Sequence, residues 1–319
     1  MGAETCAIFV DMGTTNTRAW LVRGSELLKR ATRPVGVRNT ARDKSADGIK
    51  SALKEVISEL RANTARQPEC VVAAGMITSP LGLAELPHID APAGRDEIAS
   101  AAKWLEFPEL TDLPFLLIPG VRCSPNRDSR DVMRGEETLC AGLTALRKTV
   151  FPCVLLNLGS HWKAIEIDRE RRIHSSTTSL AGELIQATLT QTVLASSLAG
   201  AWPEQVSHDW LEAGINECRR NGLTRTLFGV RLRELDGEGS PADRFSFVVG
   251  AFIADSLIAF TATGIITEKA RVVINGSPQL SEAWQRVLAR LKIPAVILDR
   301  TEAERTFLIG MNSILECAD

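Results

Sequence analysis

Tyrosine is absent from this 319-residue chain, and aromatic residues make up only 5% of it. An excess of one charge sign is also missing, because 37 basic and 39 acidic residues leave a net charge of −2. No basic run with interleaved aromatic residues occurs, so a nucleic-acid groove is not expected. The near-neutral balance also gives no long-range attraction to a membrane surface.

Long apolar runs and paired cysteines are missing as well. No uninterrupted apolar stretch approaches a membrane span, and the N-terminus, with Glu4 and no basic lead, is unlike a signal peptide. The seven cysteines show no short pair spacing, which predicts reduced thiols in a cytoplasmic protein and not disulfides or a zinc site. Apolar residues, 45% of the chain, suffice for one large domain or two ordinary ones.

The most informative segment is residues 8–18, Ile-Phe-Val-Asp-Met-Gly-Thr-Thr-Asn-Thr-Arg. It predicts a β-hairpin whose turn, residues 13–16, follows Asp11. A turn of glycine and hydroxyl residues can point N–H groups at an anion. An aspartate at a strand end can hold magnesium through the water ligands of the ion. The same residue types also suit an ordinary turn, so the segment alone leaves both interpretations open.

Two later strand ends repeat this pattern. A buried strand at 153–158 leads into Gly159-Ser160-His161 and a second hairpin strand, and a strand at 271–274 leads into Gly276-Ser277. Strand clusters followed by helices occur twice along the chain, with no short-period repeat. The sequence therefore predicts an α/β protein of two related halves, whose turns could hold a triphosphate from both sides.

Two further segments carry polar groups. Residues 75–79 follow a buried strand at 70–74, at the carboxyl end where open α/β sheets bind ligands. The segment Asp131-Val-Met-Arg-Gly-Glu-Glu-Thr138 is interpreted as the opening of a helix that runs to about Leu146. Its carboxylates are candidates for accepting a proton in acid–base catalysis.

Together these motifs resemble the 2-dehydro-3-deoxygalactonokinase family of the actin–hexokinase–sugar kinase superfamily. Met-Arg-Gly-Glu-Glu-Thr is the most specific motif. The second phosphate turn departs from the usual Pro-Gly-Thr-His-Ser/Cys-Lys-Trp, since Trp162 precedes Lys163, and Pro278 replaces a small polar residue. The matching segments, in the family's order, are 11–20, 74–79, 132–138, 159–163, 181–184 and 276–277.

The resemblance implies an α/β fold of two actin-like ATPase (ribonuclease H-like) domains with an interdomain cleft. The expected domains are 1–125 on the sugar-acid side and 126–319 on the nucleotide side. A C-terminal helix at about 302–319 could pack back against the first of these domains. The implied activity is ATP-dependent phosphorylation of 2-dehydro-3-deoxy-D-galactonate to its 6-phosphate in galactonate catabolism, with ATP and Mg²⁺ as cofactors. Epimer preference and oligomeric state, a homodimer included, stay open.

The resemblance also implies roles at the nucleotide. Asp11 is expected to hold magnesium through water. Three phosphate candidates have equally good structural alternatives: a strand-face salt bridge for Arg18, a turn hydrogen bond for His161 and an exposed strand position for Lys163. The expected phosphate and ATP residues are Gly13, Thr14, Thr15, Asn16, Arg18, Gly159, Ser160, His161, Lys163, Gly276 and Ser277.

For the sugar acid, the resemblance implies a base and a carboxylate site. Asp131 is the first candidate for the base, because in related enzymes an Asp opens a helix at this place; it could equally cap that helix. Glu136 is the reserve. Arg134, or else Arg38, could bind the substrate carboxylate. The expected substrate residues are Gly36, Val37, Arg38, Gly75, Met76, Thr78, Ser79, Arg134, Gly182 and Glu183.

Rival functions are a kinase for a different sugar acid, an acyl-phosphate or exopolyphosphate enzyme, and a non-catalytic module that closes around a nucleotide. A plain structural protein would leave the three glycine-hydroxyl strand ends unexplained.

Overall fold

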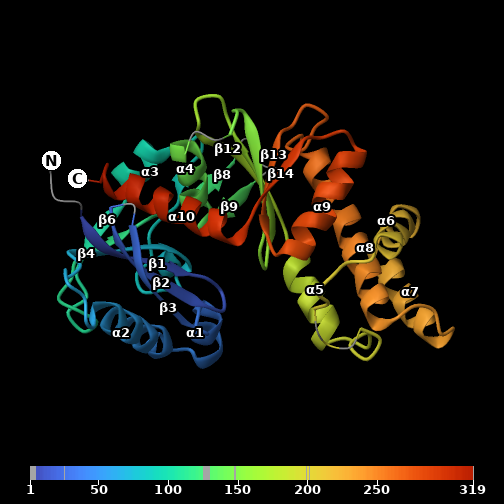
Figure 1. Cartoon of the computed structure of the whole chain (residues 1–319), viewed down its shortest axis with the longest axis horizontal. Coiled ribbons are helices and arrows are strands. Elements are labelled where there is room, and N and C mark those ends of the chain that lie inside the picture. The colour runs from blue at the N-terminus through green and yellow to red at the C-terminus, as the bar shows by residue number, and fades with distance from the viewer. Residues whose placement is uncertain are drawn as a thin grey trace. The chain divides into compact units, whose positions relative to one another are not determined.

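The computed structural model describes residues 5–24, 26–124, 130–146, 149–198, 200 and 202–318. The chain forms two compact units (Figure 1). The first unit contains residues 1–149, 169–174 and 303–319, and the second contains 150–168 and 175–302. The functional division between residues 125 and 126 stays a prediction.

The first unit is built on a six-stranded sheet of order β3-β2-β1-β4-β7-β6. β1 pairs antiparallel with β2 and parallel with β4. β4 is buried along its whole length and β1 almost so, as expected of central strands covered on both faces. The strands are β1 (Cys6–Met12), β2 (Thr17–Arg23), β3 (Glu26–Arg33), β4 (Cys70–Gly75), β6 (Lys103–Leu105) and β7 (Phe115–Leu117).

The second unit repeats this topology in a five-stranded sheet of order β12-β11-β10-β13-β14. Its first strand, β10, pairs antiparallel with β11 and parallel with β13, as β1 does with β2 and β4. The prediction of two related α/β halves is therefore confirmed. The strands are β10 (Cys153–Leu158), β11 (Trp162–Ile167), β12 (Ile173–Ser179), β13 (Val272–Gly276) and β14 (Ala295–Leu298).

A small third sheet and several helices complete the first unit. α2 turns one apolar stripe to the sheet, with Ile49, Leu53 and Val56 fully buried. The small sheet is β5 (Ile89–Asp90), β8 (Val121–Cys123) and β9 (Asp131–Met133). The helices are α1 (Val37–Asp43), α2 (Asp47–Arg61), the 3₁₀ turn η1 (Met76–Thr78), α3 (Arg95–Ala101), α4 (Glu136–Leu146) and α10 (Arg300–Leu315).

The C-terminal helix α10 packs within the first unit. Trp20 Nε1 donates to Glu304 Oε2 at 3.1 Å, and the Trp20 ring lies 5.6 Å from that of Phe307. α10 crosses α4 so closely that a Cβ on Gly142 or Gly310 would overlap the backbone of the other helix. The end of the chain is thus tied to β2 and to the helix that follows β9.

The helices of the second unit surround the long apolar helix α8. A capping box begins α8, because Asp243 N–H donates to Ser240 Oγ at 3.2 Å and Ser240 N–H donates to Asp243 Oδ2 at 2.9 Å. α8 is long and apolar enough to cross a membrane, but 72% of its apolar window is buried, as in a core helix. The helices are α5 (Ala181–Thr190), α6 (His208–Asn221), α7 (Leu223–Leu235), α8 (Pro241–Ala262) and α9 (Pro278–Arg290).

Candidate active site

Asp11, the expected magnesium ligand, lies at the carboxyl end of β1. Across the ladder it faces Arg18, whose Nη1 is 3.6 Å from Asp11 Oδ2. Burial raises the pKa of Asp11 to about 6; Arg18 opposes this shift, and the charge of Glu136 adds to it. Arg18 thus makes the salt bridge that was its structural alternative, and the charge of Glu136 acts on Asp11.

The turn that follows β1 has a fixed shape. Gly13 N–H donates to Asn16 O at 2.8 Å, and Asn16 Nδ2 donates to Thr15 Oγ1 at 2.9 Å. The fully buried Thr17 donates its hydroxyl to Val35 O at 2.8 Å. A turn held in this way can present N–H groups to an anion without rearranging.

The segment after β3 supports this turn from behind. Val37 N–H donates to Gly13 O at 3.3 Å, and Arg38 N–H donates to Thr14 O at 2.9 Å. A Cβ on Gly36 would lie 2.5 Å from Gly13 O and 2.6 Å from Thr14 O, so this approach requires glycine. All three residues were expected at the substrate; they contact the turn after β1, and a substrate role for them stays a prediction.

Two glycines leave space around the Asp11 carboxylate. Gly75 ends β4 with φ +87°, and a Cβ there would lie 2.6 Å from Met12 O and 3.2 Å from Asp11 Oδ1. Gly135 has φ +105°, and its Cβ would lie 3.4 Å from the Gly75 Cα and 3.9 Å from Asp11 Oδ1. Glu136 follows directly and opens α4. The fold thereby brings three separate sequence motifs together at the end of β1.

Arg134 is anchored to the segment after β4. Its Nη1 donates to Thr78 Oγ1 at 2.8 Å and its Nη2 donates to Leu86 O at 2.7 Å, with His88 Nδ1 at 3.4 Å from Nη2. Burial lowers the pKa of the guanidinium. Thr78 Oγ1 in turn donates to Gly75 O at 3.1 Å. Two expected substrate residues, Arg134 and Thr78, are therefore in direct contact.

Several neighbouring polar groups serve the fold. Ser79 Oγ donates to Met76 O at 2.7 Å across η1. Glu137 is fully buried, and both of its carboxylate oxygens accept the Gly135 N–H at 2.7 Å. This bond fixes the start of α4. Among the carboxylates of this motif, Glu137 therefore has a structural role.

Asp131 does not open a helix, so that prediction is wrong, as is the alternative that it caps one. It lies in β9, opposite Cys123 of β8. Residues 131–133 find a partner strand, and the positive φ of Gly135 separates them from α4. Glu136 occupies the helix-opening position on which the choice of base depended.

The second hairpin turn, Gly159-Ser160-His161, is supported by α5. A Cβ on Gly182 would overlap Gly159 O and lie 2.8 Å from Ser160 O. Glu183 N–H donates to Ser160 O at 2.7 Å, and His161 Nε2 lies 3.2 Å from Glu183 Oε2. Gly182 and Glu183, both expected at the substrate, therefore contact the turn. The hydrogen bond between His161 and Glu183 corresponds to the structural role that was the alternative for His161.

The two turns are thus built alike. In each, a glycine at the start of a helix stands against the turn: Gly36 is the N-cap of α1, and Gly182 lies in the first turn of α5. In each, a backbone N–H just after that glycine donates to a carbonyl of the turn. The sequence showed the echo between the turns but not this shared support.

Sequence reasoning missed Asn157, the counterpart of Asp11. Each residue lies two positions before the glycine of its turn. Asn157 faces Lys163 across the β10–β11 ladder, as Asp11 faces Arg18 across β1–β2. Aligning the two hairpins on their glycines could have found this pair. The second hairpin therefore has an amide and a lysine at the positions where the first hairpin has a carboxylate and an arginine.

Asn275 joins this pair from the neighbouring strand. Its Nδ2 donates to Asn157 Oδ1 at 2.7 Å, one position before the end of β13. Lys163 is only 5% exposed, so the alternative that it is an exposed strand residue is wrong. The positive charge of a lysine beside this turn favours anions over cations.

Gly276 and Ser277 lie where β13 meets α9. Ser277 is the N-cap of α9, and Pro278 is its first residue. Within the described residues, neither Ser277 Oγ nor the nearby Ser281 Oγ has a hydrogen-bond partner, although both atoms are buried. A buried hydroxyl without a partner is costly, so a ligand that supplied one would stabilise this helix start.

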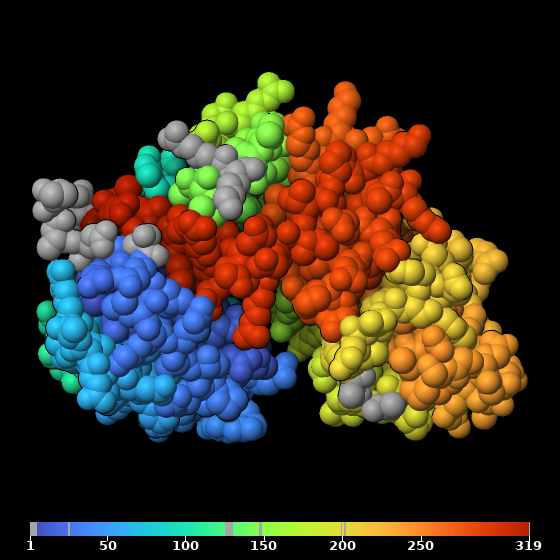
Figure 2. Space-filling model, in the orientation of Figure 1, coloured from blue at the N-terminus to red at the C-terminus, as the bar shows by residue number. Residues whose placement is uncertain are grey.

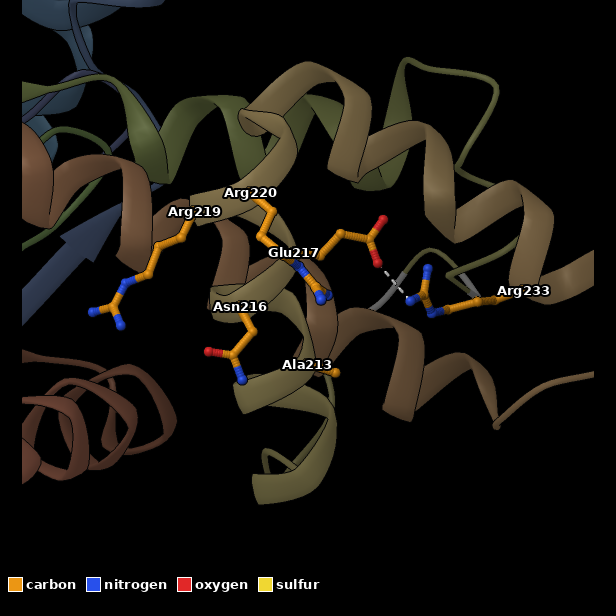
Figure 3. A pocket seen from close by; sticks show the side chains of 6 residues that line it. All are labelled: Ala213, Asn216, Glu217, Arg219, Arg220 and Arg233. Atoms are coloured by element: carbon orange, nitrogen blue, oxygen red, sulfur yellow. Dashed lines mark hydrogen bonds and ion pairs between the residues drawn. The ribbon is translucent and has the colours of Figure 1, made fainter.

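The described part of the chain contains no cluster of three metal-ligating side chains. A magnesium ion would rely on Asp11, water and phosphate oxygens, a coordination that Mg²⁺ commonly adopts. A hollow of about 450 Å³ is lined by none of the expected site residues. It lies on α6 and α7 beside Glu217, Arg220 and Arg233 (Figure 3).

Comparison with known proteins gives one family across the chain. The family model described as 2-keto-3-deoxy-galactonokinase matches residues 11–314. The 2-dehydro-3-deoxygalactonokinase of Escherichia coli strain K12 is 26% identical over 310 residues, which are 96% of this chain and 96% of that protein.

Solved structures share the fold. A Sinorhizobium meliloti protein assigned by name to the same enzyme has a TM-score of 0.77 at 23% identity, over 97% of this chain and 98% of that one. Component A of the (R)-2-hydroxyglutaryl-CoA dehydratase of Acidaminococcus fermentans has a TM-score of 0.53 at 12% identity, over 99% and 100%. These similarities, with the repeated sheet topology, show an actin-like ATPase and sugar kinase fold.

Proposed function

Because the chain belongs to the 2-keto-3-deoxy-galactonokinase family, we propose that it transfers the γ-phosphoryl group of ATP to the 6-hydroxyl of 2-dehydro-3-deoxy-D-galactonate. The chain is a kinase by family, and its acceptor is a keto-deoxy sugar acid. The observation that carries the proposal is the pair of hairpin turns, each backed by a glycine and by backbone N–H groups. The reaction belongs to galactonate catabolism in the cytoplasm.

The two hairpins would bind differently charged parts of magnesium ATP. Bound magnesium would neutralise the phosphate oxygens, and Asp11 would hold the ion through water. The N–H groups of the turns at 13–16 and 159–161 would bind phosphate oxygens, and Lys163 would add a positive charge. Since phosphoryl transfer depends on positioning and on neutralised charge, rigid turns suit it.

Glu136 is the proposed base. It opens α4 and lies close enough to Asp11 to shift the pKa of that carboxylate, which supports a position near the reacting phosphate. Its carboxylate would accept the proton of the sugar hydroxyl as the hydroxyl attacks. Asp131, in β9, is the alternative.

Arg134 is the proposed partner of the sugar-acid carboxylate. Thr78 and Leu86 fix its guanidinium, and a fixed guanidinium binds a carboxylate with defined geometry. Backbone N–H groups at 75–79 would help. The only molecular partners this reaction needs are the sugar acid and ATP, and we further propose that two copies of the chain associate.

The test is coupled ADP release with three additions: 2-dehydro-3-deoxygalactonate, its gluconate epimer and no sugar. The proposal predicts rapid release with the galactonate derivative and little release without sugar. A faster reaction with the epimer would assign a different sugar acid. Slow release that neither sugar changes would favour a non-catalytic nucleotide-binding module.

A further inference from the structure

Helix α7 packs into the second unit by one face. That face carries Thr226, Gly229 and Val230, all buried, and Arg233, whose guanidinium lies 4.1 Å from the ring centroid of Phe247 on α8. The spacing of three, four and seven residues places these side chains on one side of the helix. The interior of the unit therefore accounts for only this side of α7.

The opposite face of α7 carries a line of three exposed apolar residues. Phe228 is 50% exposed, Leu232 37% and Leu235 67%. These three residues, the α7 stripe, are spaced by four and three positions, so they form one line about 145° around the helix from the buried face. Single exposed apolar residues are ordinary, but a helix that is apolar on two faces is expected to be covered on both.

The two ends of the α7 stripe carry opposite charges. Arg225 precedes it and lies over the Phe228 ring at 5.7 Å, and Asp236 follows it at the helix C-cap. Both side chains are exposed, and within the described residues neither takes part in an ion pair. The helix dipole adds to the asymmetry, since the N-terminal end is positive and the C-terminal end negative.

A surface that is apolar in the middle and oppositely charged at its ends is complementary to itself when turned end to end. We propose that two copies of this chain associate through the α7 stripe, with their α7 helices antiparallel about a two-fold axis. Centred between Phe228 and Leu235, this packing places Phe228 of each copy against Leu235 of the other.

The same axis brings the charges together. Arg225 lies about 10 Å before the midpoint of the stripe and Asp236 about 7 Å after it, at 1.5 Å per residue. Arg225 of one copy would thus be offset by about 3 Å along the axis from Asp236 of the other, within reach of its side chain. Two such ion pairs would flank the apolar contact and fix the antiparallel orientation.

This surface is separate from the candidate active site, since no expected site residue lies on α7. It is also separate from the hollow in Figure 3, which adjoins the buried side of the helix at Arg233. The end of the second unit that α6 and α7 form is seen in yellow and orange in Figure 2. The inference deepens the proposed self-association and does not depend on the proposed kinase reaction.

Sedimentation equilibrium of the full chain over a range of micromolar concentrations tests the inference. Leu235→Lys should weaken the dimer by about 100-fold, because it places a charge in the apolar contact with Phe228 of the other copy. Ile258→Lys on α8, at a residue 58% exposed, is the matched control and should leave the dimer intact. Circular dichroism and ADP release should be unchanged for both variants.

A charge exchange tests the orientation. Arg225→Asp and Asp236→Arg should each weaken the dimer by about 10-fold through repulsion between like charges, and the double variant should restore it. A monomeric wild type would overturn the inference. So would a Leu235→Lys variant as dimeric as the wild type, or a double variant no better than either single one. Because association is measured without substrate, a failure of the kinase assay would not be mistaken for any of these results.

Discussion

At the scale of single residues, substitutions of Glu136 and Asp131 should have opposite effects on turnover. Glu136→Gln should lower kcat by about 10²- to 10⁴-fold, the range expected for loss of a general base, with little change in the KM for ATP. Asp131→Asn should retain near-normal turnover, because its side chain lies in β9 and not at the helix opening. Coupled ADP release measures both. Normal turnover in the first variant and a large loss in the second would return the role to Asp131.

The buried Asp11 lowers the stability of the ligand-free protein when its carboxylate is ionised. Its folded pKa of about 6 lies above the ordinary value of 3.8, so the native state binds this proton more tightly than the unfolded state does. Ionised Asp11 therefore costs stability, and the cost develops as the pH rises from about 4 to 6.

Asp11→Asn removes that cost. The free energy of unfolding of the variant should be about 1–3 kcal/mol higher than that of the wild type at pH 7.5. The increase should be smaller at pH 5, and the variant should lose kinase activity. Urea unfolding without ATP or magnesium at both pH values measures the effect. An equal gain at both, or destabilisation at pH 7.5, would show that burial does not shift this carboxylate.

At the scale of elements, the glycines that back the turns should control nucleotide affinity. Gly182→Ala must displace the carbonyls of Gly159 and Ser160, so the KM for ATP should rise at least about 10-fold while the fold persists. Gly48→Ala in α2 is the matched control, since nothing lies within 4 Å of its new Cβ, and it should gain about 0.5–1 kcal/mol. An unchanged KM in the Gly182 variant would mean that the second turn does not bind phosphate.

The β10–β11 hairpin gives a second test. Asn157→Asp places a carboxylate opposite Lys163, beside the turn, and should weaken ATP binding by about 10-fold through repulsion of the phosphates. Added magnesium should restore part of the affinity, because the new carboxylate could hold the ion in the way proposed for Asp11. Asn157→Leu loses the hydrogen bond to Asn275 without adding charge. If titration calorimetry shows equal losses in both variants, the role of Asn157 is structural.

Local patterns predicted the two hairpins, but not the segment around Asp131. Residues 131–133 are a strand because β8 lies beside them, and strand formation depends on such neighbours. Helix α5 ends at Thr190, where the Thr188, Thr190 and Thr192 hydroxyls bond back to carbonyls four residues earlier.

At the scale of the whole molecule, the echo between two glycine-hydroxyl turns was enough to predict a duplicated α/β fold. The contacts that place Gly36 and Gly182 behind the turns are tertiary facts without a local signal, whereas aligning the two hairpins on their glycines could have paired Asp11 with Asn157. Trp20 and Phe307 likewise meet across the length of the chain. The sequence therefore predicted which motifs matter better than which atoms they contact.

The central claim is that the chain phosphorylates the terminal hydroxyl of 2-dehydro-3-deoxygalactonate. Proton-coupled ³¹P NMR of the product, formed from ATP and this sugar acid, tests it most directly. A phosphate ester on the terminal carbon has two protons on that carbon and should give a triplet, formed with one ADP for each ester. A doublet, from an ester on a ring or secondary carbon, or inorganic phosphate as the main product, would contradict the claim.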